Sequence, residues 1–185
     1  MSTIAKSAGL AAVFVFSLGN MSGAIALDKE RYLELATATI KKADGGFVSN
    51  VHKLIKQQEE LIKIGVEGAK AYIVTHPEHA DLLNEVINNA DSMKRMTLDE
   101  IEDQWHMGKY MKAKGYDLDK FDHFGELFSL MDAIIHPATS FISLKEYKRT
   151  RNVDYLARAS AELSEVIVHV KHIKSGKATT QLSSN

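Results

Sequence analysis

Apolar residues recur every three to four positions along most of the chain, the spacing that gathers side chains on one face of an α-helix. This pattern predicts six helical segments. Their apolar faces lie within residues 27–42, 48–74, 82–90, 98–111, 124–142 and 156–173. No stretch keeps the two-residue alternation of a half-buried strand, so we expect an all-α protein.

Two of the predicted helix starts carry capping sequences. Thr75 is followed by Pro77, whose missing N–H costs nothing in a first turn, and by Glu78 three residues on. Thr97 and Glu100 repeat the Thr-x-x-Glu spacing of a capping box. We therefore expect new helices to begin after Thr75 and after Thr97.

Glycines and acidic residues mark the other boundaries. The pair Gly45-Gly46 interrupts the first pattern, and Gly115 is expected to cap the C-terminus of the helix that follows Thr97. Asp117 or Asp119 is expected to open the next helix, which should end at the turn formed by residues 151–152.

One proline lies inside a predicted helix. Pro137 has no backbone N–H, so it leaves the carbonyl of Ala133 without its usual helical donor. Polar side chains or water must satisfy that carbonyl, and we expect a kink or a break at this point.

Amphipathic helices joined by short turns bury their apolar faces most simply in an antiparallel helical bundle. We expect about four long helices plus one or two short ones. The length of 185 residues suits one domain, which we place at residues 27–174, with a flexible tail at 175–185.

The first 26 residues have the features of a signal peptide. Lys6 supplies a positive charge, residues 9–18 are apolar, and Ala24 and Ala26 offer the small side chains that signal peptidase requires. We expect cleavage after residue 26 and a soluble periplasmic protein, with no membrane span in the remaining chain. The alternative is an uncleaved N-terminal anchor helix.

Composition excludes several classes of function. The formal net charge of −1 gives no basic excess for nucleic-acid binding. The absence of cysteine excludes disulfides, a thiolate nucleophile, Cys-ligated zinc and covalent haem attachment. Motifs for a serine nucleophile, a phosphate-binding loop or a zinc-protease helix are also missing, so an enzyme is the least favoured class.

The chain has eight histidines and no cysteine, so we consider its histidines as ligands of a metal ion or a haem iron. His106 follows Glu102 by four residues and His123 precedes Glu126 by three, so each pair shares one side of a helix. Each pair is a candidate for two metal ligands. The alternative for both is a solvated surface pair.

Methionines close to His106 widen this hypothesis. Met93, Met96, Met107 and Met111 could supply soft sulfur ligands for cuprous copper, or one axial ligand of a non-covalently held (b-type) haem. The alternative is that they fill irregular gaps in the core.

The last predicted helix carries a stripe of acids and histidines. Glu162, Glu165, His169 and His172 follow one another at one-turn spacing, and the two histidines are candidate metal ligands. Because the stripe flanks the apolar face, the alternative is an ordinary solvated surface.

Asp132 and His136 form a candidate ligand-binding pair beside Pro137. They lie opposite the apolar stripe of their own helix. If that side turns inward, the two residues make a polar site within the bundle; if it turns outward, they are surface.

These observations support a non-enzymatic periplasmic binding or accessory protein for an unidentified small ligand or protein partner, and they leave an oligomer open. The alternative is a metal- or haem-binding bundle that uses His and Met ligands. A ferritin-like di-iron site is disfavoured, because that site needs two Glu-x-x-His motifs and the chain offers none.

Overall fold

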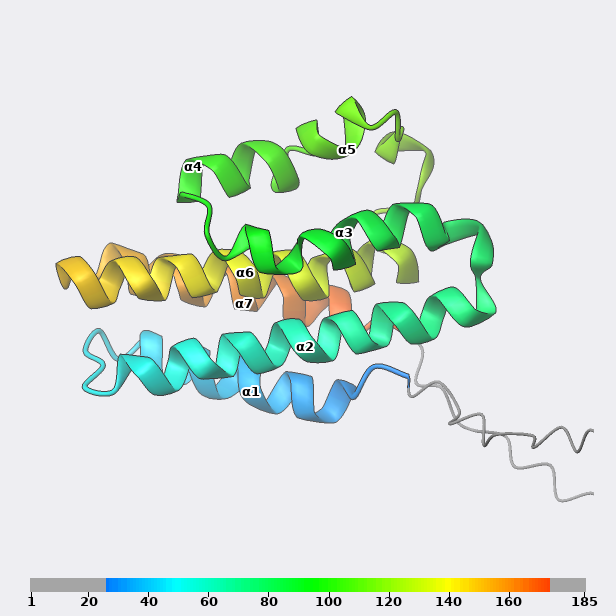
Figure 1. Cartoon of the computed structure of the whole chain (residues 1–185). Coiled ribbons are helices and arrows are strands. Elements are labelled where there is room, and N and C mark those ends of the chain that lie inside the picture. Colours follow the sequence, from blue (N-terminus) through cyan, green and yellow to red (C-terminus); the bar gives the residue numbers. More distant parts are fainter. Residues whose placement is uncertain (1–25, 174–185) are drawn as a thin grey trace, which may run out of the picture.

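A computed structural model of the chain describes residues 26–173, and all regular structure within this range is helical (Figure 1). The prediction of an all-α protein is thereby confirmed. The expected signal peptide, apart from Ala26, and the expected tail at 175–185 lie outside the described residues.

Four long helices lie side by side. They are α1 (Lys29–Ala43), α2 (Val51–Thr75), α6 (Glu126–Thr150) and α7 (Asp154–Val170). Contacts join α1 to α2, α2 to α6, α6 to α7 and α7 back to α1, which closes a four-membered ring. Neighbouring helices of this ring run in opposite directions along the common axis in Figure 1.

The chain between α2 and α6 covers one side of this ring. A 3₁₀ turn (Pro77–His79) leads into α3 (Ala80–Met93), which packs on α2 and α6. Short elements follow, drawn in shades of green in Figure 1. They are α4 (Leu98–Ile101), a π-helical turn (Glu102–His106), α5 (Lys109–Ala113) and a second 3₁₀ turn (Leu118–Lys120).

Helix α6 is the core helix of the described structure. It contacts α2, α3, α7 and the π-helical turn, so its polar side is covered as well as its apolar one. By length and composition α6 could cross a membrane, contrary to the expectation that no such segment follows the leader. Its most apolar window is 89% buried among the other helices, which is the environment of a core helix.

Helix α6 passes through Pro137 without a break. The hydroxyl of Tyr32 on α1 donates to the carbonyl oxygen of Ala133 at 3.0 Å, and this supplies the donor that the proline lacks. The prediction that a polar side chain satisfies this carbonyl is confirmed. A break at this point is wrong, because the missing bond is replaced by one from a neighbouring helix, and the alternative, a kink, stays a prediction.

Several boundaries differ from those predicted. The capping box of Thr97 and Glu100 is confirmed, and Gly115 has the positive φ of +88° that suits a helix C-terminus. Thr75, however, is the last residue of α2, and its hydroxyl donates to the Tyr72 carbonyl instead of capping the next helix.

The region after Thr97 is less regular than its pattern predicted. Gly108, with φ +67°, separates α5 from the π-helical turn, so the segment is not one helix. Neither Asp117 nor Asp119 opens the next long helix, because α6 begins only at Glu126.

Candidate metal centre

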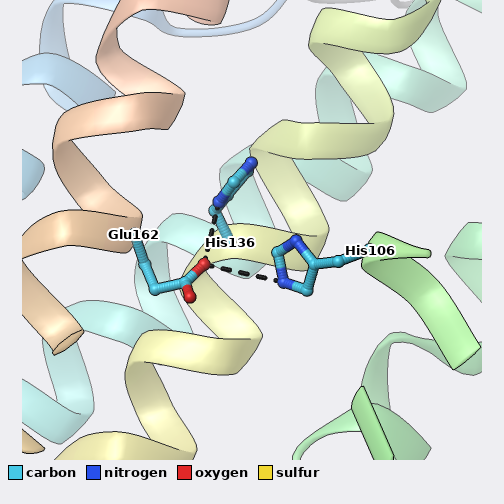
Figure 2. A group of neighbouring side chains, drawn as sticks. All are labelled: His106, His136 and Glu162. Carbon is cyan, nitrogen blue, oxygen red and sulfur yellow. Dashed lines mark hydrogen bonds and ion pairs between the residues drawn. The ribbon is translucent and has the colours of Figure 1, made fainter. Parts of the chain in front are cut away.

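Three side chains from three separate elements meet beside the middle of α6. His106 comes from the π-helical turn, His136 from α6 and Glu162 from α7 (Figure 2). The Oε2 atom of Glu162 lies 2.9 Å from Nδ1 of His136 and 3.6 Å from Nε2 of His106. One potential ligand atom from each residue lies within 4.8 Å of the other two.

The three side chains are largely withdrawn from solvent, with exposed fractions of 16% for His106, 7% for His136 and 12% for Glu162. The Nε2 atom of His106 also contacts the hydroxyl of Thr139 at 2.8 Å. An arrangement of polar groups this well covered must satisfy itself internally or through a bound ion.

The π-helical turn positions His106. Its wider turn is closed by a bond from the Met107 amide to the Glu102 carbonyl at 2.9 Å, five residues back. Trp105 is buried in the core and its ring stacks on Tyr110 at 4.6 Å between centroids. With Trp105 anchored, the next residue, His106, faces α6.

A second polar group adjoins the first. Oδ2 of Asp132 on α6 lies 3.0 Å from Nδ1 of His169 on α7, yet neither atom has a hydrogen-bond partner within residues 26–173. The pair is close but not aligned for a hydrogen bond. On its other side, Oδ1 of Asp132 lies 4.0 Å from Nε2 of His136.

Four imidazoles form a row through both groups. The ring centroids are 4.9 Å apart for His106 and His136, 6.2 Å for His136 and His169, and 5.0 Å for His169 and His123. The carboxylates of Asp132 and Glu162 lie beside the row. The carboxylate of Glu162 is close to both His106 and His136, and that of Asp132 is close to both His136 and His169.

Burial shifts the protonation of the first group. Burial lowers the pKa of His106, and the nearby charge of Glu162 only partly opposes this. For His136 burial acts in the same direction, but the hydrogen bond to Glu162 and the charge of Asp132 outweigh it, so its pKa is raised. His136 therefore holds a proton more tightly than His106 in the absence of an ion.

The second group is shifted more strongly. Burial raises the pKa of Asp132 to about 6, although His136 and His123 oppose the shift. Burial, together with repulsion from His123 and His136, lowers the pKa of His169 to about 4. At neutral pH the Asp132 carboxylate is ionised and His169 is a neutral imidazole, which are the forms that bind metal.

A cavity of about 510 Å³ opens onto both groups. Its lining includes the candidate ligands His106, His123, Asp132, His136 and His169, with Trp105 in the wall. Asp119 and Glu165 add further acidic side chains. A cavity of this size leaves room for solvent or a small ligand next to the imidazoles.

The structure brings together residues that the sequence placed in different clusters. Asp132, His136, His106 and His169 all line one cavity, and the ring of His123 lies beside that of His169. His136 faces inward, which the pattern of its helix left open.

The other candidate residues lie elsewhere. Glu102 is an exposed residue that pairs with Arg158 at 3.0 Å. Glu126, at the first position of α6, does not line the cavity, and His172 is exposed with its ring 5.6 Å from that of Phe124. The candidate pairs along single helices are thus replaced by groups that span helices.

Two contributions were missed in the sequence. Glu162 was placed on a solvated stripe, but α6 and the π-helical turn cover it, and Thr139 was not singled out at all. Of the methionines near His106 in the sequence, Met93 and Met111 lie in the core, while Met107 is exposed and lines the cavity, as does Met131. The burial of α6 on all sides is the signal that would have directed attention to its polar residues.

No family model, curated protein or solved structure matches the chain. The chemistry of the site is therefore the basis for assigning a function.

Proposed function

We propose that this protein binds a divalent transition-metal ion through His106, His136 and Glu162, within an antiparallel helical bundle. The observation that carries the proposal is the convergence of two imidazoles and a carboxylate from three separate elements, with ligand atoms within 4.8 Å of one another. Residues adjacent on one helix often pair by chance, whereas three elements rarely meet on one point without a reason.

The spacing of these atoms suits a small ion. Ligand atoms bound at ~2.0–2.1 Å to a tetrahedral ion lie roughly 3.3 Å apart. The distances from Glu162 Oε2 to the two imidazoles, 2.9 Å and 3.6 Å, bracket that value. To bind the ion, Nε2 of His106 would give up its contact with the Thr139 hydroxyl and coordinate the metal instead.

The ligand set indicates the kind of metal. Two histidines and one carboxylate suit zinc, cobalt or ferrous iron, and three protein ligands leave at least one coordination position for water or a small molecule. The cavity beside the site provides the space for it. The carboxylate among the three ligands and the absence of cysteine disfavour a soft cuprous ion, although Met107 and Met131 line the cavity.

Charge supports an ion in preference to haem. Asp119, Asp132 and Glu165 all line the cavity, and these acids would repel the propionates of a haem. Near Glu162 the balancing charge comes from Arg158, whose Nε is 3.8 Å away and whose Nη2 also pairs with Glu102. A divalent cation would offset the negative charge that these groups leave.

A second candidate function is the binding of a small organic cation in the same cavity without a metal. The acidic lining favours it, because Asp132 is ionised at neutral pH and has an unpartnered oxygen. We rank it second because it gives no role to the approach of His106 to Glu162.

The cellular location of the protein is part of the proposal. Export to the periplasm and cleavage of the leader are supported by Lys6, the apolar residues 9–18 and the small residues before position 27. Fractionation of expressing cells tests this. We expect a periplasmic protein that begins at residue 27. A cytosolic protein with its leader intact would contradict the proposed location.

Metal titration tests the function. The purified chain is stripped with a chelator, dialysed, and titrated calorimetrically with Zn²⁺ and, in parallel, with Co²⁺, whose absorption reports coordination. We expect stoichiometric binding. Because Trp105 is the sole tryptophan and lines the cavity, Co²⁺ should also quench the protein fluorescence.

Matched variants decide whether the ion is in this site. His136→Ala and Glu162→Gln should weaken Zn²⁺ binding by more than the ~10–100-fold that loss of an outer-shell partner costs. His52→Ala, which removes an exposed histidine of α2, should leave binding unchanged. Absence of binding, or an equal loss in all three variants, would overturn the proposal.

A further inference from the structure

Asp132 and His169 lie close together in a way that a hydrogen bond does not explain. Their side chains are only 15% and 10% exposed, and their facing atoms, Oδ2 and Nδ1, are 3.0 Å apart. Both atoms nonetheless lack a hydrogen-bond partner among the described residues. Buried polar atoms without partners are costly, and a bound ion or water is a usual reason for their retention.

We infer that this protein holds a second divalent cation, bound by Asp132 and His169, with water completing its coordination. The inference rests on the proposed metal centre, since His136 lies between the two groups. The facing atoms of Asp132 and His169 are near the ~3.3 Å that separates two ligands of one tetrahedral ion.

His123, an exposed residue in the segment before α6, lies at the edge of this pair, but its ring nitrogens do not join the two facing atoms within the 4.8 Å that encloses the first group. Its ring is 5.0 Å from that of His169 and nearly perpendicular to it, at 86°. All three residues line the same cavity. An ion could enter through that cavity, which extends past both groups.

His136 ties the two positions together. Its Nδ1 faces Glu162 at 2.9 Å, and its Nε2 faces Asp132 at 4.0 Å. The two nitrogens of one ring thus point at the two acids. Each acid belongs to a different proposed ion, so the positions are neighbours but use separate carboxylates.

Charge also favours two ions over one. Asp132, Glu162, Glu165 and Asp119 bring four carboxylates to the two groups and their shared cavity. Arg158 lies 3.8 Å from Glu162, and Asp119 and Glu165 are exposed, so the buried carboxylate whose charge a second cation would balance is that of Asp132.

The stoichiometry of zinc binding tests the inference. Surface histidines could take an ion of their own, because His76 and His79 stack with centroids 6.2 Å apart. All measurements are therefore made on the full chain carrying His76→Ala and His79→Ala, stripped with a chelator and titrated with Zn²⁺ alone. Bound zinc is counted by elemental analysis after equilibrium dialysis.

We expect two zinc ions per chain in this background. Asp132→Asn, which keeps the shape of the side chain, should reduce the count to one, and His169→Gln should do the same. Glu162→Gln should also leave one ion, and the combination of Asp132→Asn with Glu162→Gln should leave none. Unchanged far-ultraviolet circular dichroism confirms that each variant is folded.

The outcomes separate the two proposals. A count of one that falls to zero with Glu162→Gln but is unchanged by Asp132→Asn overturns the second ion and leaves the first intact. A count of zero in the background protein overturns the proposed function and the second ion together. A count of two that neither Asp132→Asn nor His169→Gln reduces places the extra ion elsewhere and overturns the inference.

Discussion

The hydroxyl of Tyr32 donates to the carbonyl oxygen of Ala133 at 3.0 Å, across the interface between α1 and α6. Tyr32 is fully buried, and Ala133 is the residue whose carbonyl Pro137 deprives of a backbone donor. One side chain thus restores a hydrogen bond that the sequence of α6 cannot make for itself. The relationship also fixes α1 against the part of α6 that carries His136.

Tyr32→Phe should reduce the free energy of unfolding by ~1–3 kcal/mol, because it leaves a buried carbonyl unsatisfied. In a Pro137→Ala background the amide at position 137 supplies the donor, so the same substitution should cost clearly less. Urea denaturation of the four proteins in this double-mutant cycle measures the difference. An equal cost in both backgrounds would show that the hydroxyl does not compensate for the proline.

Gly65→Ala should destabilise the protein by ~2–3 kcal/mol through overpacking. A Cβ at Gly65 would lie 2.5 Å from the Ala133 carbonyl oxygen and 2.9 Å from its carbon, and this is backbone of a core helix that cannot easily move. Thermal unfolding measures the effect.

Gly68→Ala on the same helix is the matched control. Its Cβ would meet the side chain of Leu27 at 2.7 Å and the Leu27 Cα at 3.1 Å, in the segment before α1 and not in a core helix. We expect a smaller loss than for Gly65→Ala. A larger loss of stability for Gly68→Ala would mean that the contact between Gly65 and α6 is not the more tightly packed of the two.

Trp105→Ala should cost ~3–5 kcal/mol, since it removes a large core side chain. Trp105 is 4% exposed and stacks on Tyr110. Met107→Ala, at a neighbouring position that is 69% exposed, should change stability by less than ~0.5 kcal/mol. Chemical denaturation compares the two, and a loss under ~1 kcal/mol for the tryptophan variant would contradict the register of this turn.

Asp132→Asn should stabilise the metal-free protein at neutral pH. Burial raises the pKa of Asp132 from 3.8 to about 6 in the folded state, so ionisation opposes folding. Stability attributable to this group is present below pH ~4 and is lost as pH rises through about 6. At pH 7.5 the variant should gain up to roughly 3 kcal/mol, at ~1.4 kcal/mol per pKa unit, and at pH 4 the gain should vanish.

Unfolding curves at both pH values, with a chelator present, provide the measurement. Glu165→Gln is the control, since that carboxylate is 69% exposed and its removal should have little effect. Saturating zinc should reverse the order by stabilising the native protein more than the variant. An Asp132→Asn protein that is less stable than the parent at both pH values would refute the argument.

The helices and the Thr97 capping box could be predicted from sequence because both depend on neighbours within a few positions. Leu163, Val166 and Val170 recur at helical spacing and are fully buried. The exact start of α6 could not be predicted in this way. Asp117 and Asp119 resemble caps, yet the chain makes a 3₁₀ turn there and α6 begins at Glu126.

The site depends on packing between helices, which the periodicity of one helix does not contain. Glu162 flanks the apolar face of α7, so its burial is decided by whether another element covers the flank. Similarly, His136 lies opposite the apolar stripe of α6 and is buried because α7 and the π-helical turn pack on that side. Sequence reasoning could name His106, His136, Asp132 and His169 as candidates, but not their convergence.

The π-helical turn at Glu102–His106 holds one residue more than the same length of α-helix would. Each residue of an α-helix turns the chain by about 100°. Loss of one residue within the π-helical turn would let the chain close there as an ordinary α-helical turn and leave His106 facing α6, whereas one residue added to a neighbouring α-helical turn would rotate His106 by about that angle. The extra residue thus makes the orientation of this imidazole tolerant of a deletion within the turn but sensitive to an insertion beside it.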